Sequence, residues 1–175
     1  RILIIHTGGT FGMTPMAPEN TLQPGKIEQD ISRHLPDLDK LAEINIEIPF
    51  NLDSSNIGPD QWIELFYLLE KNHHLYDGFI IIHGTDTLVY TATAISFLTT
   101  QYSKPIIFTG SQRPLSAIRS DARSNLINAV ELATRDIPEV TICFDNKLYR
   151  ANRTKKQSIE SYHGFDSPNY PPLAK

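Results

Sequence analysis

The chain has 175 residues, of which 40% are hydrophobic, a composition typical of a single globular domain that buries a core. Its formal net charge of -4 at pH 7 provides no basic stripe to neutralise phosphates, so nucleic acid is excluded as an expected partner and small molecules are favoured. Cys143 is the single cysteine, which excludes an internal disulfide and a multi-cysteine metal site, and we expect a buried thiol without chemistry.

In chain order, short apolar runs alternate with longer segments of helical period, a pattern that predicts an α/β fold. We expect an open, mainly parallel sheet with helices on both faces, a three-layer arrangement of flavodoxin-like or Rossmann-like type. The predicted strands are Ile2 to His6, Ile44 to Phe50, Phe79 to His83, Pro105 to Thr109 and Val140 to Phe144. The predicted helices are Ile27 to Leu35, Asp60 to Lys71, Thr87 to Gln101 and Asp121 to Arg135.

The longest apolar runs are far too short for a transmembrane helix, which needs about 20 apolar residues. No segment resembling a signal peptide opens the chain. We therefore expect no membrane association and a cytoplasmic location. At the other end, Ser167 to Lys175 is proline-rich and non-periodic, and we expect it to begin a linker.

Hydroxyl groups follow four of the predicted strands. The carboxyl ends of parallel strands meet at one edge of a sheet, where ligands bind in open α/β folds. Adjacent glycines let backbone approach a ligand, and hydroxyls beside an aspartate can bind an amino-acid-like zwitterion or supply a nucleophile. In chain order the loops are Thr7-Gly8-Gly9-Thr10-Phe11-Gly12, Asp53-Ser54-Ser55, Gly84-Thr85-Asp86-Thr87 and Gly110-Ser111-Gln112-Arg113-Pro114.

Each of these segments also has a purely structural interpretation. The glycines after the first strand do not have the G-x-G-x-x-G spacing, and there is no P-loop motif, so phosphate binding is not predicted. Thr85, Asp86 and Thr87 are residue types that cap helices. Lys156 lies in Arg153-Thr154-Lys155-Lys156, which by itself indicates a solvated basic loop.

Taken together, the segments resemble the bacterial L-asparaginase family from Ile4 to about Leu173. Thr7-Gly8-Gly9-Thr10 matches the first signature of the family, and His83-Gly84-Thr85-Asp86-Thr87 matches the second. Three further segments resemble the type I, cytoplasmic branch: Gly110-Ser111-Gln112-Arg113-Pro114, Arg119-Ser120-Asp121-Ala122-Arg123 and Leu148-Tyr149-Arg150-Ala151-Asn152-Arg153. The resemblance implies that residues 1 to 175 are an amino-terminal catalytic domain, with a smaller carboxy-terminal domain absent.

The resemblance also implies hydrolysis of L-asparagine to L-aspartate and ammonia through an acyl-enzyme, with no metal and no cofactor, in a homo-oligomer. Thr10 corresponds to the nucleophile, and Thr85 is grouped with Asp86 and with Lys156, the candidate base. Asp86 and Ser54 correspond to residues that hold the α-amino and α-carboxylate groups of the substrate. Further substrate-binding candidates are Thr85, Asp53, Ser55 and Ser111.

The sequence departs from the family in the segment after the first signature. Family members carry a tyrosine there that bonds to the nucleophilic threonine, whereas Thr14 to Pro24 contains none and Thr21 or Leu22 stands in its place. Phe11 to Pro24 lacks helical or strand period, and we expect it to be a lid that orders over the site when substrate binds.

A rival hypothesis from another class is an amino-acid-binding or assembly module that keeps the fold without turnover. One version is a subunit of a tRNA-dependent amidotransferase, against which the lack of a basic composition argues weakly.

Overall fold

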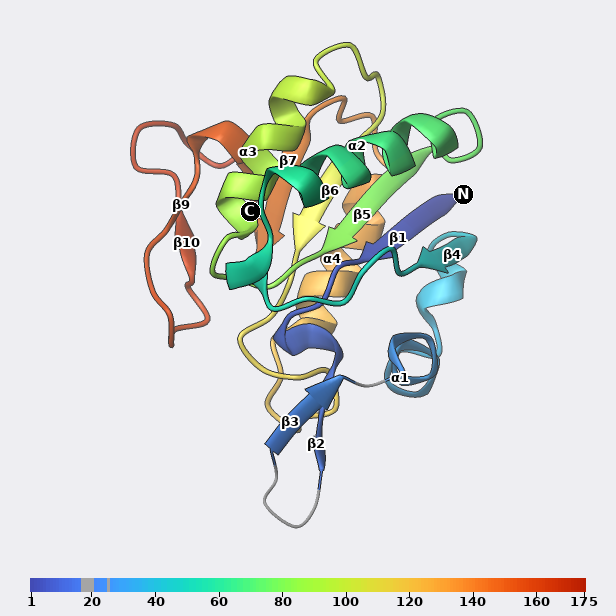
Figure 1. The fold of residues 1–175 in the computed structure, drawn as a ribbon, viewed down its shortest axis with the longest axis vertical. Coiled ribbons are helices and arrows are strands. Elements are labelled where there is room, and N and C mark those ends of the chain that lie inside the picture. The colour runs from blue at the N-terminus through green and yellow to red at the C-terminus, as the bar shows by residue number, and fades with distance from the viewer. Residues whose placement is uncertain (17–20, 25) are drawn as a thin grey trace.

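A six-stranded sheet forms the centre of the computed structural model, which describes residues 1–16, 21–24 and 26–175 (Figure 1). The strand order is β4-β1-β5-β6-β7-β8, and every neighbouring pair is parallel except β7 and β8. The strands are β1 (Ile2–His6), β4 (Ile44–Glu47), β5 (Gly78–Ile82), β6 (Ile106–Thr109), β7 (Val140–Phe144) and β8 (Lys147–Arg150). The predicted fold class, an open and mainly parallel α/β sheet, is confirmed.

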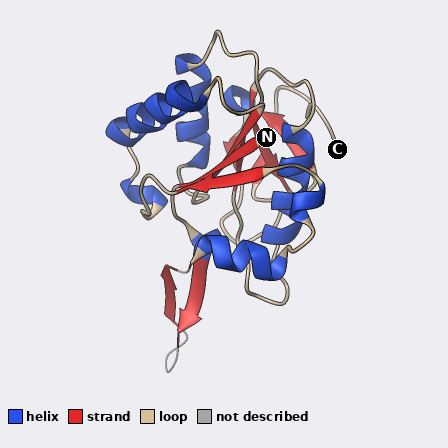
Figure 2. Ribbon diagram, turned by 90° about the vertical axis from the view of Figure 1, so that its right-hand side faces the viewer, coloured by secondary structure: helices blue, strands red, loops and turns tan. Residues whose placement is uncertain are grey.

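Helices cover both faces of the sheet, which Figure 2 shows nearly edge-on between them. Side chains alternate along a strand, so Ile2 and Ile4 pack with one pair of helices whereas Leu3 and Ile5 pack with the other. The first pair is α1 (Ile27–His34) and α4 (Ala122–Ala133), and the second is α2 (Pro59–Asn72) and α3 (Leu88–Leu98). These two buried clusters make the three layers that the sequence predicts.

The order of the parallel strands is flavodoxin-like, because the chain starts at β1, adds β4 on one side, and then adds β5, β6 and β7 on the other. The direction therefore reverses between β1 and β5. In open α/β sheets ligands bind at this point, beyond the carboxyl ends of the strands. The loops after His6 and Ile82, which carry the two signatures, lie side by side there, since these residues pair in register.

The connection through α4 has the opposite hand to the other three. The chain moves along the sheet in one direction from β4 to β7, with α2 and α3 on one face, yet α4 lies on the face of α1. Nearly all such crossovers are right-handed, so β6-α4-β7 is the unusual one. Its leading loop, 110–121, reaches the far face at the carboxyl edge of the sheet, where Leu115 N donates to Phe11 O at 3.1 Å.

Two predicted strands and all four predicted helices shift by a few residues at their ends. β6 begins at Ile106, since Pro105 has no backbone N–H to donate. β4 ends at Glu47 rather than Phe50, where its pairing with Ile5 stops. α3 ends at Leu98 rather than Gln101, because Thr99 returns both its N–H and its hydroxyl to Ile95 O.

The antiparallel elements were not predicted from the sequence. β8 follows β7 through a turn at Asp145 and Asn146, whose φ angles are 50° and 58°, a conformation that Asn and Asp tolerate in tight hairpins. A short ribbon joins β9 (Lys155–Lys156) to β10 (Phe165–Asp166). Four short 3-10 helices complete the chain: η1 (Thr10–Gly12), η2 (Leu38–Lys40), η3 (Ser54–Asn56) and η4 (Ala151–Arg153).

The expectation that 11–24 lacks strand structure is wrong. After η1 the chain forms a hairpin of β2 (Met13–Met16) and β3 (Thr21–Pro24), which projects from the body in Figures 1 and 2. Four-residue strands that contain prolines show no clear alternation, which is why the sequence hides them. Residues 17–20 and 25 lie outside the described part of the chain, and the lid stays a prediction.

The carboxyl-terminal residues extend the sheet. Leu173 N donates to Leu148 O at 2.7 Å, and Leu148 N donates to Ala174 O at 3.0 Å, so this segment lies antiparallel to β8. Ordered pairing therefore continues to Ala174 within the stretch that we expected to begin a linker.

Two glycines bring the site loops into backbone contact. Gly8 has φ +118°, and a Cβ there would lie 2.1 Å from Leu52 O, with which Gly8 forms a parallel bridge. Gly9 has φ +83°, and its Cβ would lie 2.5 Å from the Cα of Gly84. No other residue type fits either position, so the loop after β1 is wedged between 52 and 84.

We expect Gly8→Ala to lower the free energy of unfolding by about 3 kcal/mol, since it adds both φ strain and a backbone clash. Gly58→Ala is the matched control, because φ is -139° there and nothing lies within 4 Å of the added carbon. Urea denaturation of both variants measures the difference. Equal stability of the two would contradict the packing argument.

Candidate active site

Lys156 joins the second signature across the carboxyl edge of the sheet. Its Nζ donates to Thr85 Oγ1 at 3.0 Å and to Asp86 Oδ1 at 2.5 Å. The Lys156 side chain is 17% exposed whereas that of Asp86 is 62% exposed. Lys156 is therefore no solvated surface residue: it forms one group with Thr85 and Asp86, as the resemblance implies.

The β9-β10 ribbon places Lys156 at this position. Phe165 pairs with Lys156 in the ribbon and is 3% exposed. Its ring packs edge-on against Phe144 of β7 at a centroid distance of 4.8 Å, and Phe165 O accepts a hydrogen bond from Tyr149 at 3.1 Å. The aromatic contact anchors the ribbon to the core, so the lysine ammonium is held over the end of the sheet.

Thr10 opens η1, directly after the glycine that packs on Gly84. Its side chain is half-buried, and the hydrogen bonds among residues 1–14 and 26–175 include none from its hydroxyl. The structure thus places Thr10 next to the loop of Thr85 and Asp86, and joins it to them through the Gly9–Gly84 contact rather than by a side-chain bond.

Ser54 belongs to the same cluster. It is 3% exposed, its Oγ lies 2.7 Å from the position of a Cβ on Gly84, and its carbonyl accepts a hydrogen bond from Thr87 Oγ1 at 2.6 Å. Thr87 therefore ties the loop after β5 to η3. From the sequence, Thr87 had a capping role only.

Asp53 and Ser55 bond to each other at the rim. Asp53 Oδ1 accepts from Ser55 Oγ at 2.7 Å and from Ser55 N at 2.8 Å. These two bonds, the hydroxyl bond first, hold the pKa of Asp53 below its usual value. Both side chains are exposed, so they cap η3 and border the site.

Ser111 lies in the interior of its loop. It is 2% exposed, and its hydroxyl donates to Arg113 O at 2.6 Å. The side chain thus stabilises the turn after β6, and the structure does not join it to Thr85, Asp86 or Lys156.

Gln112 is the site residue that sequence reasoning missed, although it lies in a quoted segment. Its Oε1 faces the Thr85 hydroxyl, which donates to it at 3.4 Å. Its backbone N donates to the carboxylate of Asp121 at 2.9 and 3.1 Å. Burial raises the pKa of Asp121, and the bonds from Gln112 N and Arg113 N oppose that rise. Asn125 Nδ2, which donates to Gly110 O at 2.9 Å, completes this bracket.

Two buried histidines lie beneath the loops. His6 ends β1 and is 2% exposed, and His83 follows β5 and is 1% exposed. Burial lowers the pKa of each imidazole to about 4, so both are neutral at pH 7. His83 Nδ1 contacts Gly84 O at 2.8 Å, which fixes the ring next to the site without placing it among the hydroxyls.

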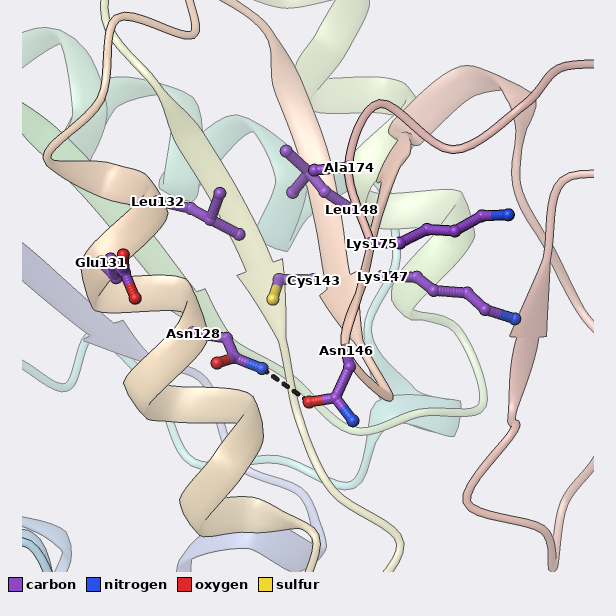
Figure 3. Close-up of a pocket in the computed structure, with 9 residues that line it drawn as sticks. All are labelled: Asn128, Glu131, Leu132, Cys143, Asn146, Lys147, Leu148, Ala174 and Lys175. Atoms are coloured by element: carbon purple, nitrogen blue, oxygen red, sulfur yellow. Dashed lines mark hydrogen bonds between the residues drawn. The ribbon is translucent and has the colours of Figure 1, made fainter.

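A cavity of about 310 Å³ lies elsewhere, between α4 and the β7-β8 hairpin (Figure 3). Leu132, Cys143 and Leu148 face it, and an Asn128 Nδ2 to Asn146 Oδ1 bond of 3.0 Å crosses one end. Cys143 is 1% exposed, and burial raises its pKa to about 12, which keeps the thiol protonated and supports the expectation of an inert residue. None of the expected site residues lines this cavity.

The family model described as Asparaginase, N-terminal, matches residues 1–175. The chain belongs to the asparaginase family. It is 40% identical over 177 residues to L-asparaginase 1 of Escherichia coli (strain K12), covering 98% of this chain and 52% of that protein. The crystal structure of L-asparaginase I from Vibrio cholerae superposes with a TM-score of 0.87 at 39% identity, covering 98% of this chain and 52% of that one.

A relative with another printed role is a glutamyl-tRNA(Gln) amidotransferase subunit of Archaeoglobus fulgidus. It is 31% identical over 181 residues, covering 99% of this chain and 43% of that protein. The asparaginase-family chain thus spans about half the length of the curated relatives that it matches, or less. Within its described residues no helix is long and apolar enough to cross a membrane.

The buried histidines predict how stability depends on pH. Their folded pKa values lie below the unfolded value of 6.5, so their contribution is complete above pH 6.5 and is lost as pH falls towards 4. Between pH 7 and 5 each should cost about 2 kcal/mol. His83→Gln should therefore flatten the decline measured by urea denaturation, whereas exposed His74→Gln should not. Identical pH slopes in both variants would refute the assignment.

Proposed function

We propose that the protein containing this chain hydrolyses L-asparagine to L-aspartate and ammonia, with a threonine as nucleophile. The observation that supports this most is the contact of one lysine with both Thr85 and Asp86. A lysine, a hydroxyl and a carboxylate in one group can move a proton and bind an α-amino acid.

In the proposed reaction, Thr10 Oγ attacks the side-chain amide carbon of the substrate. Its proton passes to the leaving nitrogen, ammonia departs and an acyl-threonine remains; water then attacks the ester and releases aspartate. Backbone N–H groups of the glycine turn stabilise the oxyanion. Thr85 and Lys156 transfer the protons, and no metal or organic cofactor takes part.

Asp86 and Ser54 hold the substrate backbone in this proposal. The Asp86 carboxylate is mostly exposed, so the α-ammonium of asparagine can reach it. That second cation competes with Lys156 for the same carboxylate, and the competition weakens the ion pair that favours the lysine ammonium. Substrate binding thereby helps Lys156 to accept a proton. Asp53, Ser55 and Ser111 act through the walls of the pocket and its loops.

The second candidate function is an amino-acid-binding or assembly module within a larger complex. The relationship to an amidotransferase subunit favours it. Assembly into a homo-oligomer and a cytoplasmic location complete the proposal. Ammonia release from asparagine by the complete gene product separates the two candidates, because a module without turnover releases none.

Thr10→Ala should abolish turnover without unfolding the protein, because it deletes the attacking oxygen and little else. Lys156→Met should lower kcat at least about 100-fold while asparagine still binds, since the lysine serves proton transfer. Exposed Thr100→Ala is the control and should leave both constants unchanged. Steady-state ammonia release gives kcat, and calorimetry gives substrate affinity. Near-wild-type turnover of Thr10→Ala would move the nucleophile to Thr85.

The 175-residue chain alone should hydrolyse asparagine poorly. In the proposal a second domain of a neighbouring copy closes the pocket, and misplacing reacting groups by about an ångström costs on the order of 100-fold in rate. Ammonia release by the chain and by the complete protein at saturating asparagine compares the two, with circular dichroism confirming that both are folded. Comparable turnover numbers would show that the site is self-contained.

A further inference from the structure

Residues 158–163, here called the strap, connect β9 to β10 and lie against the loop after β6. Their base is closed by Ser158 N, which donates to Gly164 O at 3.3 Å. Inside the strap, Ser158 Oγ accepts from Ser161 N at 3.0 Å. Tyr162 Oη donates to Arg119 O at 2.5 Å, and His163 contacts the Asp145 carboxylate. The strap is thus a folded segment bound to the scaffold at two points beside the site.

A third contact runs through the side chain of Gln112. Its Nε2 donates to Ser161 O at 3.0 Å and to Ser158 O at 3.5 Å. Carbonyl oxygens only accept, so the NH₂ group must face the strap and the amide oxygen must face Thr85. The backbone of Gln112 cannot turn to avoid this, because the Asp121 carboxylate holds its N–H.

The orientation of this amide determines the direction of the Thr85 proton. An amide oxygen accepts, so the Thr85 hydroxyl donates to Gln112 and its own oxygen is left to accept from Lys156. If the strap moved away, the amide could rotate and present NH₂ to Thr85. The hydroxyl would then be free to donate to Lys156, which is the direction that proton transfer to the lysine requires.

We propose that Gln112 is a positioning residue that couples the strap to the catalytic threonine–lysine pair: the strap orients the amide, and the amide orients the Thr85 hydroxyl. The coupling rests on the proposed function for its catalytic consequence, but the mechanical link between strap and Thr85 does not. Gln112 itself touches neither the attacking oxygen nor the amide that is cleaved.

Kinetics of the complete protein test the catalytic part. Gln112→Met keeps the length and removes both hydrogen-bonding ends, so kcat should change about tenfold while KM stays within about twofold. Tyr162→Phe loosens the strap without touching Gln112 and should change kcat in the same direction. Gln157→Met, at an exposed glutamine next to Lys156, is the control and should change neither.

The double variant decides whether the two residues act through one path. If the strap acts through Gln112, adding Tyr162→Phe to Gln112→Met has no further effect on kcat. Effects that multiply would overturn the coupling, as would a change confined to KM.

Hydrogen–deuterium exchange tests the link without turnover, so it decides even if the protein releases no ammonia from asparagine. Tyr162→Phe should raise exchange about tenfold in the strap and also in residues 84–87. In the Gln112→Met background the effect on 84–87 should vanish while that on the strap persists. Unchanged exchange of 84–87 in Tyr162→Phe would overturn the proposal, with Gln157→Met again the reference.

Discussion

The whole site depends on the absence of two side-chain carbons. Gly8 lies against Leu52 and Gly9 against Gly84 at distances that no Cβ can occupy, and both have positive φ. The loop after β1 is therefore held between the loops after β4 and β5, at the point where the strand order reverses. Hydroxyls from three segments meet there because backbone touches backbone, and not because the side chains attract one another.

The unusual hand of the β6-α4-β7 connection supplies the fourth loop. A crossover of the common hand would send the chain to the face of α3, away from Phe11. Instead, residues 110–121 pass to the other face, where Leu115 packs beside Phe11 and Asp121 binds the backbone of Gln112. The buried carboxylate of Asp121 thus holds a loop in place, whereas the exposed carboxylate of Asp86 is open to a ligand. Their different environments separate their roles.

The sequence predicts the part of the fold that depends on local pattern. Five parallel strands and four helices have clear apolar periodicity, and the signatures identify the loops after β1 and β5. What it could not predict depends on short antiparallel pairing: the β2-β3 hairpin, β8 and the β9-β10 ribbon. Two- to four-residue strands show too few alternations to be recognised, and their pairing is set by turns such as that at Asp145.

The same limit applies within the site. Thr85, Asp86 and Lys156 are expected together only from the family resemblance, since 71 positions separate Thr85 from the lysine and nothing local reports their contact. Gln112 had a signal, a long amide in a loop at the carboxyl edge, but no rule of sequence says which way an amide points. That orientation is set by the carbonyls of Ser158 and Ser161, which belong to a non-periodic segment.

The position of the lysine is therefore a property of the aromatic core as much as of the polar site. Lys156 lies on a strand of only two residues, and such a strand has no stability of its own. Phe165, its partner in the ribbon, is buried against Phe144 and receives the Tyr149 hydroxyl on its carbonyl. Because the same ribbon carries the strap, one buried ring fixes both the lysine that contacts Thr85 and the carbonyls that orient Gln112.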